Sequence, residues 1–200
     1  MFCYILLTVY KTNDKIVSMM NEMKENMKNS IVGFRLPRFE EITNVGLYLE
    51  QTVKYINFFL EPLGEPEITA SMISNYVKHK LVRAPERKQY FAEHIACLIF
   101  IAVVKQVVAL DDIRVMFGVQ TDSYDIKTAY NYFCDEFENT LYFAFGTTET
   151  YAQLGKTTSD AKDLLRNAIN AVVTKIYPSP HSDRLKQFPI KFKSPYLLLQ

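Results

Sequence analysis

The sequence contains no tryptophan, only three cysteines, six glycines and eight prolines among its 200 residues. The cysteines stand at positions 3, 97 and 134, far apart, odd in number and without a CxxC pair. We therefore expect buried thiols in a reducing compartment, and neither a disulfide framework nor a zinc framework. The low glycine and proline contents exclude a collagen-like or linker-like chain.

Net charge is also nearly absent. The chain has 23 basic and 22 acidic residues, a formal charge of +1 and an isoelectric point of about 7.6. No global field therefore draws it toward DNA or a membrane. A hydrophobic content of 48% with only 22% charged residues excludes an intrinsically disordered chain. This length makes one sizeable domain or two small ones, with enough chain to bury a core.

Long hydrophobic runs are missing as well. The two apolar runs, at 1–10 and 95–104, have about half of the roughly 20 residues that span a bilayer. The run at 95–104 predicts a buried core helix. The first run has no basic segment before it and no cleavage site after it, so we expect no signal peptide and a cytoplasmic location. Residues 1–18 are either a misassigned upstream start or a short helix or strand that covers the core.

Patterns typical of catalysis or metal binding are absent from the sequence. His79, His94 and His181 form no HxxxH or HxH pair that would hold a metal, and His94 is expected to be a capping or core residue. The GKT triplet at 155–157 has Thr150 where a phosphate-binding loop needs its first glycine. A thiolate at position 97 is disfavoured by its apolar neighbours. We predict a protein that is not an enzyme and has no cofactor and no metal.

Apolar residues recur at helical spacing nearly throughout, which predicts a mostly α protein. The first half predicts four helices in a row. They cover 45–60, ended by Pro62 and Gly64; 69–79, with Thr69 as N-cap; 92–108; and a short stretch from Asp111-Asp112 to Gly118.

The second half predicts a hairpin of two amphipathic helices, at 122–144 and 158–177, followed by an extended arm from 178. A loop over 146–159 joins the helices. The hairpin completes the core or, in the sharper alternative that we rank second, forms a dimer interface or a small-molecule pocket. That pocket would be lined by Tyr130, Phe133, Phe137, Tyr142 and Phe145.

A basic segment at 78–90 carries five cations and one acidic residue, a net charge of +4. On a helix over 69–79, Ile73 and Tyr76 can face the core and leave short polar side chains and a lysine outward, a set suited to base edges and phosphates. Tyr76 also stands where its hydroxyl can turn to a phosphate. An ordinary solvated surface is the alternative, because basic patches without a motif are poorly specific.

The order of features over 68–117 resembles the winged helix-turn-helix head of MerR-type transcriptional regulators. The corresponding positions are Ile73, Tyr76, Leu81, Pro85, Tyr90, Leu110, Asp112 and Ile113. The stretches LPRFEEI (36–42), VGLYLEQTVKYIN (45–57) and ITASMISNYVKHKLV (68–82) resemble the domain-of-unknown-function 1836 family still more closely. This resemblance covers about 34–117 and implies a cytoplasmic, MerR-like DNA-binding head; the family itself has no settled biochemical activity.

Two positions depart from the MerR pattern. Ser74 replaces the recognition-helix arginine and Lys80 replaces the exit glycine. The loss of the arginine removes one strong phosphate or base contact.

The sequence leads to one hypothesis and one competitor from another class. The hypothesis is a sequence-specific transcriptional regulator that binds double-stranded DNA as a homodimer, with an unknown small-molecule effector. It divides the chain into an amino-terminal extension (1–30), a winged helix-turn-helix head (31–118) and a carboxyl-terminal helical region (119–200). The competitor is a protein-interaction module that uses the same head without DNA. The expected DNA-binding residues are Ser71, Ser74, Asn75, Tyr76, Lys78, Lys80, Arg83, Arg87 and Lys88.

Overall fold

The computed structural model describes residues 15, 17–19, 21–23, 25–26, 28–64, 67–152, 154 and 159–176. The described chain is mostly α, as predicted, and the described residues from 15 to 31 are helical. The expectations for residues 1–14 and for the arm from 178 lie outside the described residues. The elements are η1 (Phe39–Glu41), β1 (Leu47–Tyr48), α2 (Leu49–Leu60), η2 (Glu61–Leu63), α3 (Ala70–Lys78), β2 (Gln89–Tyr90), α4 (Ala92–Val104), α5 (Leu110–Ser123), α6 (Ile126–Ala144) and α7 (Asp160–Ile176).

A small antiparallel sheet replaces the first turn of the helix that we expected from residue 45. β1 pairs with β2 in the register Leu47↔Tyr90. Gly46, just before β1, lies so close to β2 that a Cβ on it would stand 2.7 Å from the Cβ of Gln89. Only glycine fits this approach, so α2 begins at Leu49 and the sheet ties the start of α2 to the segment before α4.

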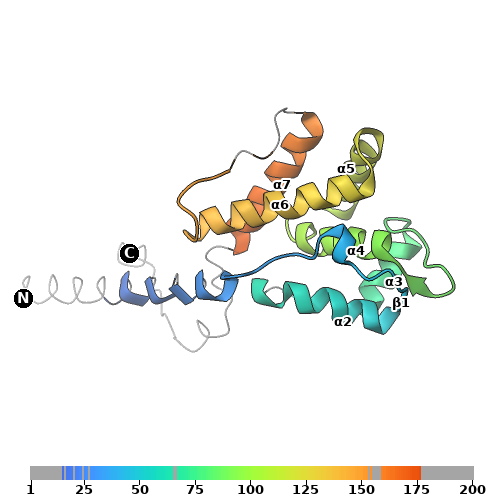
Figure 1. Cartoon of the computed structure of the whole chain (residues 1–200), viewed down its shortest axis with the longest axis horizontal. Coiled ribbons are helices and arrows are strands. Elements are labelled where there is room, and N and C mark those ends of the chain that lie inside the picture. The colour runs from blue at the N-terminus through green and yellow to red at the C-terminus, as the bar shows by residue number, and fades with distance from the viewer. Residues whose placement is uncertain are drawn as a thin grey trace, which may run out of the picture.

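Helix α4 is the centre of the core, and the prediction for 95–104 is confirmed. It lies between α2 on one side and α6 and α7 on the other (Figure 1). His94 is 4% exposed, and its Nδ1 accepts a hydrogen bond of 3.1 Å from the Phe91 amide. This nitrogen satisfies a free amide at the start of α4, which confirms that His94 is a capping and core residue. Within the described ranges, no helix is long and apolar enough to cross a membrane.

One continuous hydrophobic core joins the head to the carboxyl-terminal hairpin. Phe133 of α6 lies at its middle, with its ring centroid 5.0 Å from that of Phe100 and 5.8 Å from that of Phe137. The aromatic stripe of α6 therefore serves mainly to pack the core, as we ranked it. Of its five members, Tyr130, Phe133, Phe137 and Phe145 are buried and Tyr142 is half-buried.

Helix boundaries around Gly118 differ from the prediction. The helix expected to close at Gly118 continues to Ser123, and the one before it ends at Val104 instead of 108. Gly118 is exposed, and a glycine in an exposed helix costs only about 1 kcal/mol. The packing of α5 against α7 and α6 outweighs this cost. The boundary drawn at 118/119 consequently falls inside α5.

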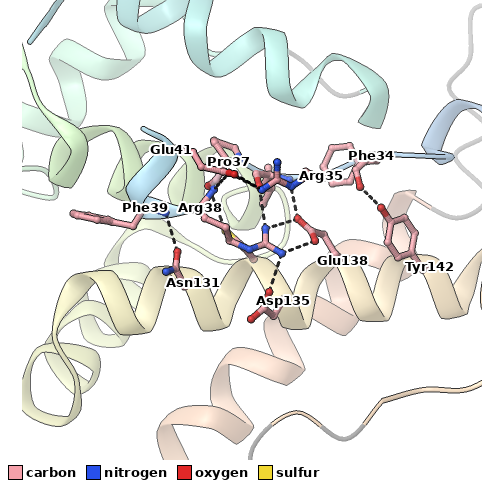
Figure 2. Close-up of polar contacts among 12 residues, drawn as sticks. Phe34, Arg35, Pro37, Arg38, Phe39, Glu41, Asn131, Asp135, Glu138 and Tyr142 are labelled. Carbon is pink, nitrogen blue, oxygen red and sulfur yellow. Dashed lines mark hydrogen bonds and ion pairs between the residues drawn. The ribbon is translucent and has the colours of Figure 1, made fainter. Parts of the chain in front are cut away.

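A clamp around Arg38 fixes the segment at 34–41 to α6 (Figure 2). The Arg38 guanidinium donates to both carboxylate oxygens of Glu138 at 2.7 Å and to Asp135 at 2.8 Å. The same Glu138 carboxylate accepts the Leu36 amide at 2.8 Å. Hydrogen bonding with Glu138 raises the pKa of Arg38 above its ordinary value. Polar groups about 100 residues apart in the sequence thus satisfy one another and hold the head against the hairpin.

Candidate nucleic-acid interface

Helix α3 is built with one buried and one exposed face. Its N-cap is Thr69, as predicted, whose hydroxyl accepts the Met72 amide at 3.3 Å. Ile73 is fully buried and fixes the inner face against α2. The outer face carries exposed polar side chains with no apolar residue between them. Its exposed residues are Ser71, Ser74, Asn75 and Lys78.

Tyr76 is the exception among the residues expected to contact DNA. It is only 4% exposed and belongs to the hydrophobic core, and burial raises the pKa of its phenol. The expectation of a phosphate contact is therefore corrected: Tyr76 packs the inner face of α3. The other eight residues of the expected set are all exposed.

The end of α3 requires an unusual backbone conformation. Lys80 has φ of 55°, in the left-handed region that favours glycine. The amide of Leu81 donates a hydrogen bond of 2.9 Å to the carbonyl of Tyr76. The amide of Lys80 donates one of 3.0 Å to the carbonyl of Val77. This pair of hydrogen bonds defines a Schellman motif, in which Lys80 takes the position that usually holds glycine.

Replacement of Lys80 by glycine should stabilise the protein by about 0.5–1 kcal/mol, because glycine adopts this φ without steric cost. Chemical denaturation measures the change. The matched control is Lys78→Gly, two residues earlier and still in α3, which should destabilise the protein by a similar amount. A loss of stability in Lys80→Gly would contradict the cap.

The segment after α3 turns back through a two-residue hairpin. Glu86 and Gln89 exchange two backbone hydrogen bonds, of 3.0 and 2.8 Å, around Arg87 and Lys88. Both central residues have positive φ, 50° and 67°. Such turns prefer Asn-Gly, so two long cations here carry backbone strain. Strain of this kind is typical of functional sites, and both side chains are exposed.

The cations of the basic segment fall into two groups. Arg83 lies 3.3 Å from Glu86 and 3.8 Å from Glu93, so part of its charge is compensated. The other four make no ion pair within the described part of the chain, although ion pairs are frequent elsewhere in it. These unpaired cations are Lys78, Lys80, Arg87 and Lys88. We call the surface formed by these four cations, Arg83 and the exposed face of α3 the basic edge. Its residues are Ser71, Ser74, Asn75, Lys78, Lys80, Arg83, Arg87 and Lys88.

Arg114 also belongs near this site, although it was not among the residues expected to contact DNA. Its guanidinium donates to the carbonyl of His79 at 3.0 Å and to Asp111 at 2.8 Å. It thereby satisfies a free carbonyl at the end of α3 and connects α5 to the basic edge. One feature of the sequence could have identified Arg114: it directly follows Ile113 in the segment that resembles the MerR pattern.

The described cysteines offer no nucleophile. Burial raises the pKa of Cys97 and of Cys134 to about 12. Both are free thiols, and because their pKa values are raised they stay protonated at neutral pH. This agrees with the expectation that a thiolate is disfavoured at Cys97.

The architecture defines a mostly α domain with a minimal sheet and a basic helical edge. Residues 37–133, which run from the clamp into α6, match the model of a family described as domain of unknown function (DUF1836). The match supports the assignment of this segment to the DUF1836 family, as its sequence stretches suggested. Neither the curated proteins nor the solved structures gave a match.

Proposed function

We propose that the protein is a cytoplasmic transcriptional regulator that binds double-stranded DNA through a MerR-like winged helix-turn-helix head. Helix α3 enters the major groove and the hairpin at 86–89 acts as the wing. The observation that carries this proposal is the basic edge itself: exposed polar side chains on one helix face, next to four cations that make no ion pair in the described chain.

The order of elements supports a winged head. From β1 to α4 the order is a strand, two α-helices joined by the short 3-10 helix η2, a second strand paired with the first, and a third α-helix. Lys80 adds a specific argument, because it adopts the left-handed conformation at the position where the MerR pattern has a glycine. The backbone requirement behind that pattern is therefore kept although the glycine is not.

The chemistry of the edge suits both parts of DNA recognition. The major groove is about 12 Å wide and admits a helix, where Asn75 can accept and donate to an adenine edge. The lysines and Arg87 suit phosphates, whose contacts position the protein without reading sequence. The rest of the chain sums to −3, since the whole carries +1 and residues 78–90 carry +4. An acidic remainder limits binding of DNA outside the basic edge, so the overall charge of +1 is compatible with this function.

Selection from random DNA duplexes at physiological salt tests the proposal. We expect an enriched inverted repeat, because a homodimer binds two half-sites related by two-fold symmetry. The absence of any enriched sequence, together with binding that does not depend on salt, would overturn DNA recognition.

Replacement of Asn75 by alanine should cost about 1–3 kcal/mol of binding to the selected site and relax the preference at one base pair. Fluorescence anisotropy with the selected duplex and a scrambled one measures both quantities. Asn170→Ala is the control, since Asn170 is also an exposed helical asparagine but lies on α7. Equal losses for the two variants would remove Asn75 from the recognition surface.

A second candidate function, docking of a protein partner on the head, is favoured by one observation. Val45, Tyr48 and Phe58, around β1 and α2, are 71%, 56% and 71% exposed. Large apolar side chains at this exposure mark interaction surfaces when they are contiguous. If duplex selection fails while Phe58→Ser abolishes capture of a partner, the head is an interaction module.

A further inference from the structure

A cavity of about 190 Å³ lies where α4, α5, α6 and α7 meet. Its inner wall is made of buried side chains, among them Ala96, Met116 and Phe133. Exposed lining residues, such as Tyr124 and Leu164, mark its outer end. The cavity therefore reaches from the surface into the core, between the head and the carboxyl-terminal hairpin.

The size and lining of this cavity indicate what it holds. Protein interiors contain few voids larger than a water molecule, whereas an engineered apolar cavity of about 150 Å³ binds benzene. The lining here is almost entirely apolar and rich in rings, which water does not fill well. Its aromatic members are Phe100, Phe117, Tyr124, Tyr130, Tyr132 and Phe133. We propose that this cavity is a binding site for a small uncharged aromatic molecule of one or two fused rings.

The single charged residue of the lining explains the preference for an uncharged ligand. Lys162, on α7, places its Nζ 5.3 Å from the centroid of the Tyr132 ring and 6.0 Å from that of Tyr124. Its charge is thus already directed at two ring faces of the wall, which favours cation–π contact with them. The rest of the lining is mostly apolar and offers dispersion contacts to a flat ring.

Helix α5 connects this cavity to the basic edge. It supplies Met116, Phe117, Val119 and Gln120 to the wall, and its Arg114 donates a hydrogen bond to the carbonyl of His79 at the end of α3. A ligand that shifts α5 therefore changes the support of α3. This part of the inference rests on the proposed function; the binding of the ligand does not.

Binding is tested on the full chain with indole and toluene as probes, by titration calorimetry and by the shift of the melting temperature. We expect saturable binding to one site and a higher melting temperature, because a ligand that binds the folded state stabilises it. Ala161→Leu should weaken probe binding at least tenfold, since Ala161 lines the cavity. Ala171→Leu, an exposed position on the same helix, is the matched control and should bind as the unmodified protein does.

Three outcomes decide the proposal. No saturable binding of either probe, or equal binding by the two leucine variants, overturns the site. If Ala161→Leu does not fold, Ala129→Leu fills the cavity from α6 and the same comparison applies. If a probe binds but the affinity for the selected duplex does not change, the link through α5 is overturned and the binding site stands. If duplex selection fails, the result on probe binding is unaffected.

Discussion

Replacement of Arg38 by alanine should lower the free energy of unfolding by about 3 kcal/mol, among the largest effects of any single polar change in this protein. The Glu138 carboxylate, whose side chain is 11% exposed, would lose both guanidinium hydrogen bonds and keep its charge in a poorly hydrated place. Removal of one partner from such a pair costs more than the pair contributes, because the remaining ion stays desolvated. Urea denaturation measures the change.

The neighbouring pair of Arg35 and Glu41 is the matched control. Its atoms approach to 2.6 Å, but the two side chains are 53% and 44% exposed. Arg35→Ala should therefore cost less than about 1 kcal/mol. The double variant Arg38→Met, Glu138→Leu should recover part of the loss, because two apolar groups leave no unpaired charge. Equal effects of Arg38→Ala and Arg35→Ala would show that the clamp does not hold the head.

Local patterns predicted the helices well, because apolar spacing and helix caps depend only on residues that are close in the sequence. The buried α4, the cap at Thr69 and the stripe of α6 all follow from such spacing. Boundaries failed where a distant contact decided them. Gly118 is a helix stop in isolation, yet α5 continues to Ser123, and the helix as a whole packs on α7. The segment 45–48 is helical by pattern, yet it pairs with β2.

Contacts between distant residues could not be predicted from the sequence. Arg38 and Glu138 are charged residues on two separate segments, and no local signal selects this pair from the other charges. The cavity depends on the relative placement of four helices, so no sequence motif predicts it.

Eight of the nine residues expected to contact DNA are exposed, as a surface role requires, and three features of this surface were not predicted. Tyr76 turned inward because it lies on the same face of α3 as the fully buried Ile73. Arg114 reaches the end of α3 from a helix 35 residues away. The positive φ values of Lys80, Arg87 and Lys88 are invisible in a sequence that has no glycine at these positions. Their strain is the feature that sharpens the proposed function.

The double variant Arg87→Asn, Lys88→Gly should change stability and DNA binding in opposite directions. Asn-Gly suits a turn with two positive φ values, so the free energy of unfolding should rise by about 1–2 kcal/mol. Affinity for the selected duplex should fall about tenfold, and the slope of log affinity against log salt should shrink by about two units, because two phosphate contacts are lost. Denaturation and salt-dependent anisotropy measure the two effects.

A second pair of changes separates charge from strain at the same turn. Arg87→Gln with Lys88→Gln removes both charges but leaves two residues with side chains at positive φ, so binding should fall as before without the gain in stability. If the Asn-Gly variant gains stability and binds DNA as well as the unmodified protein, the two cations have no part in recognition and the hairpin is not a wing. If binding falls in both variants while only Asn-Gly gains stability, then the chain keeps a strained turn because its two charges contact the DNA backbone.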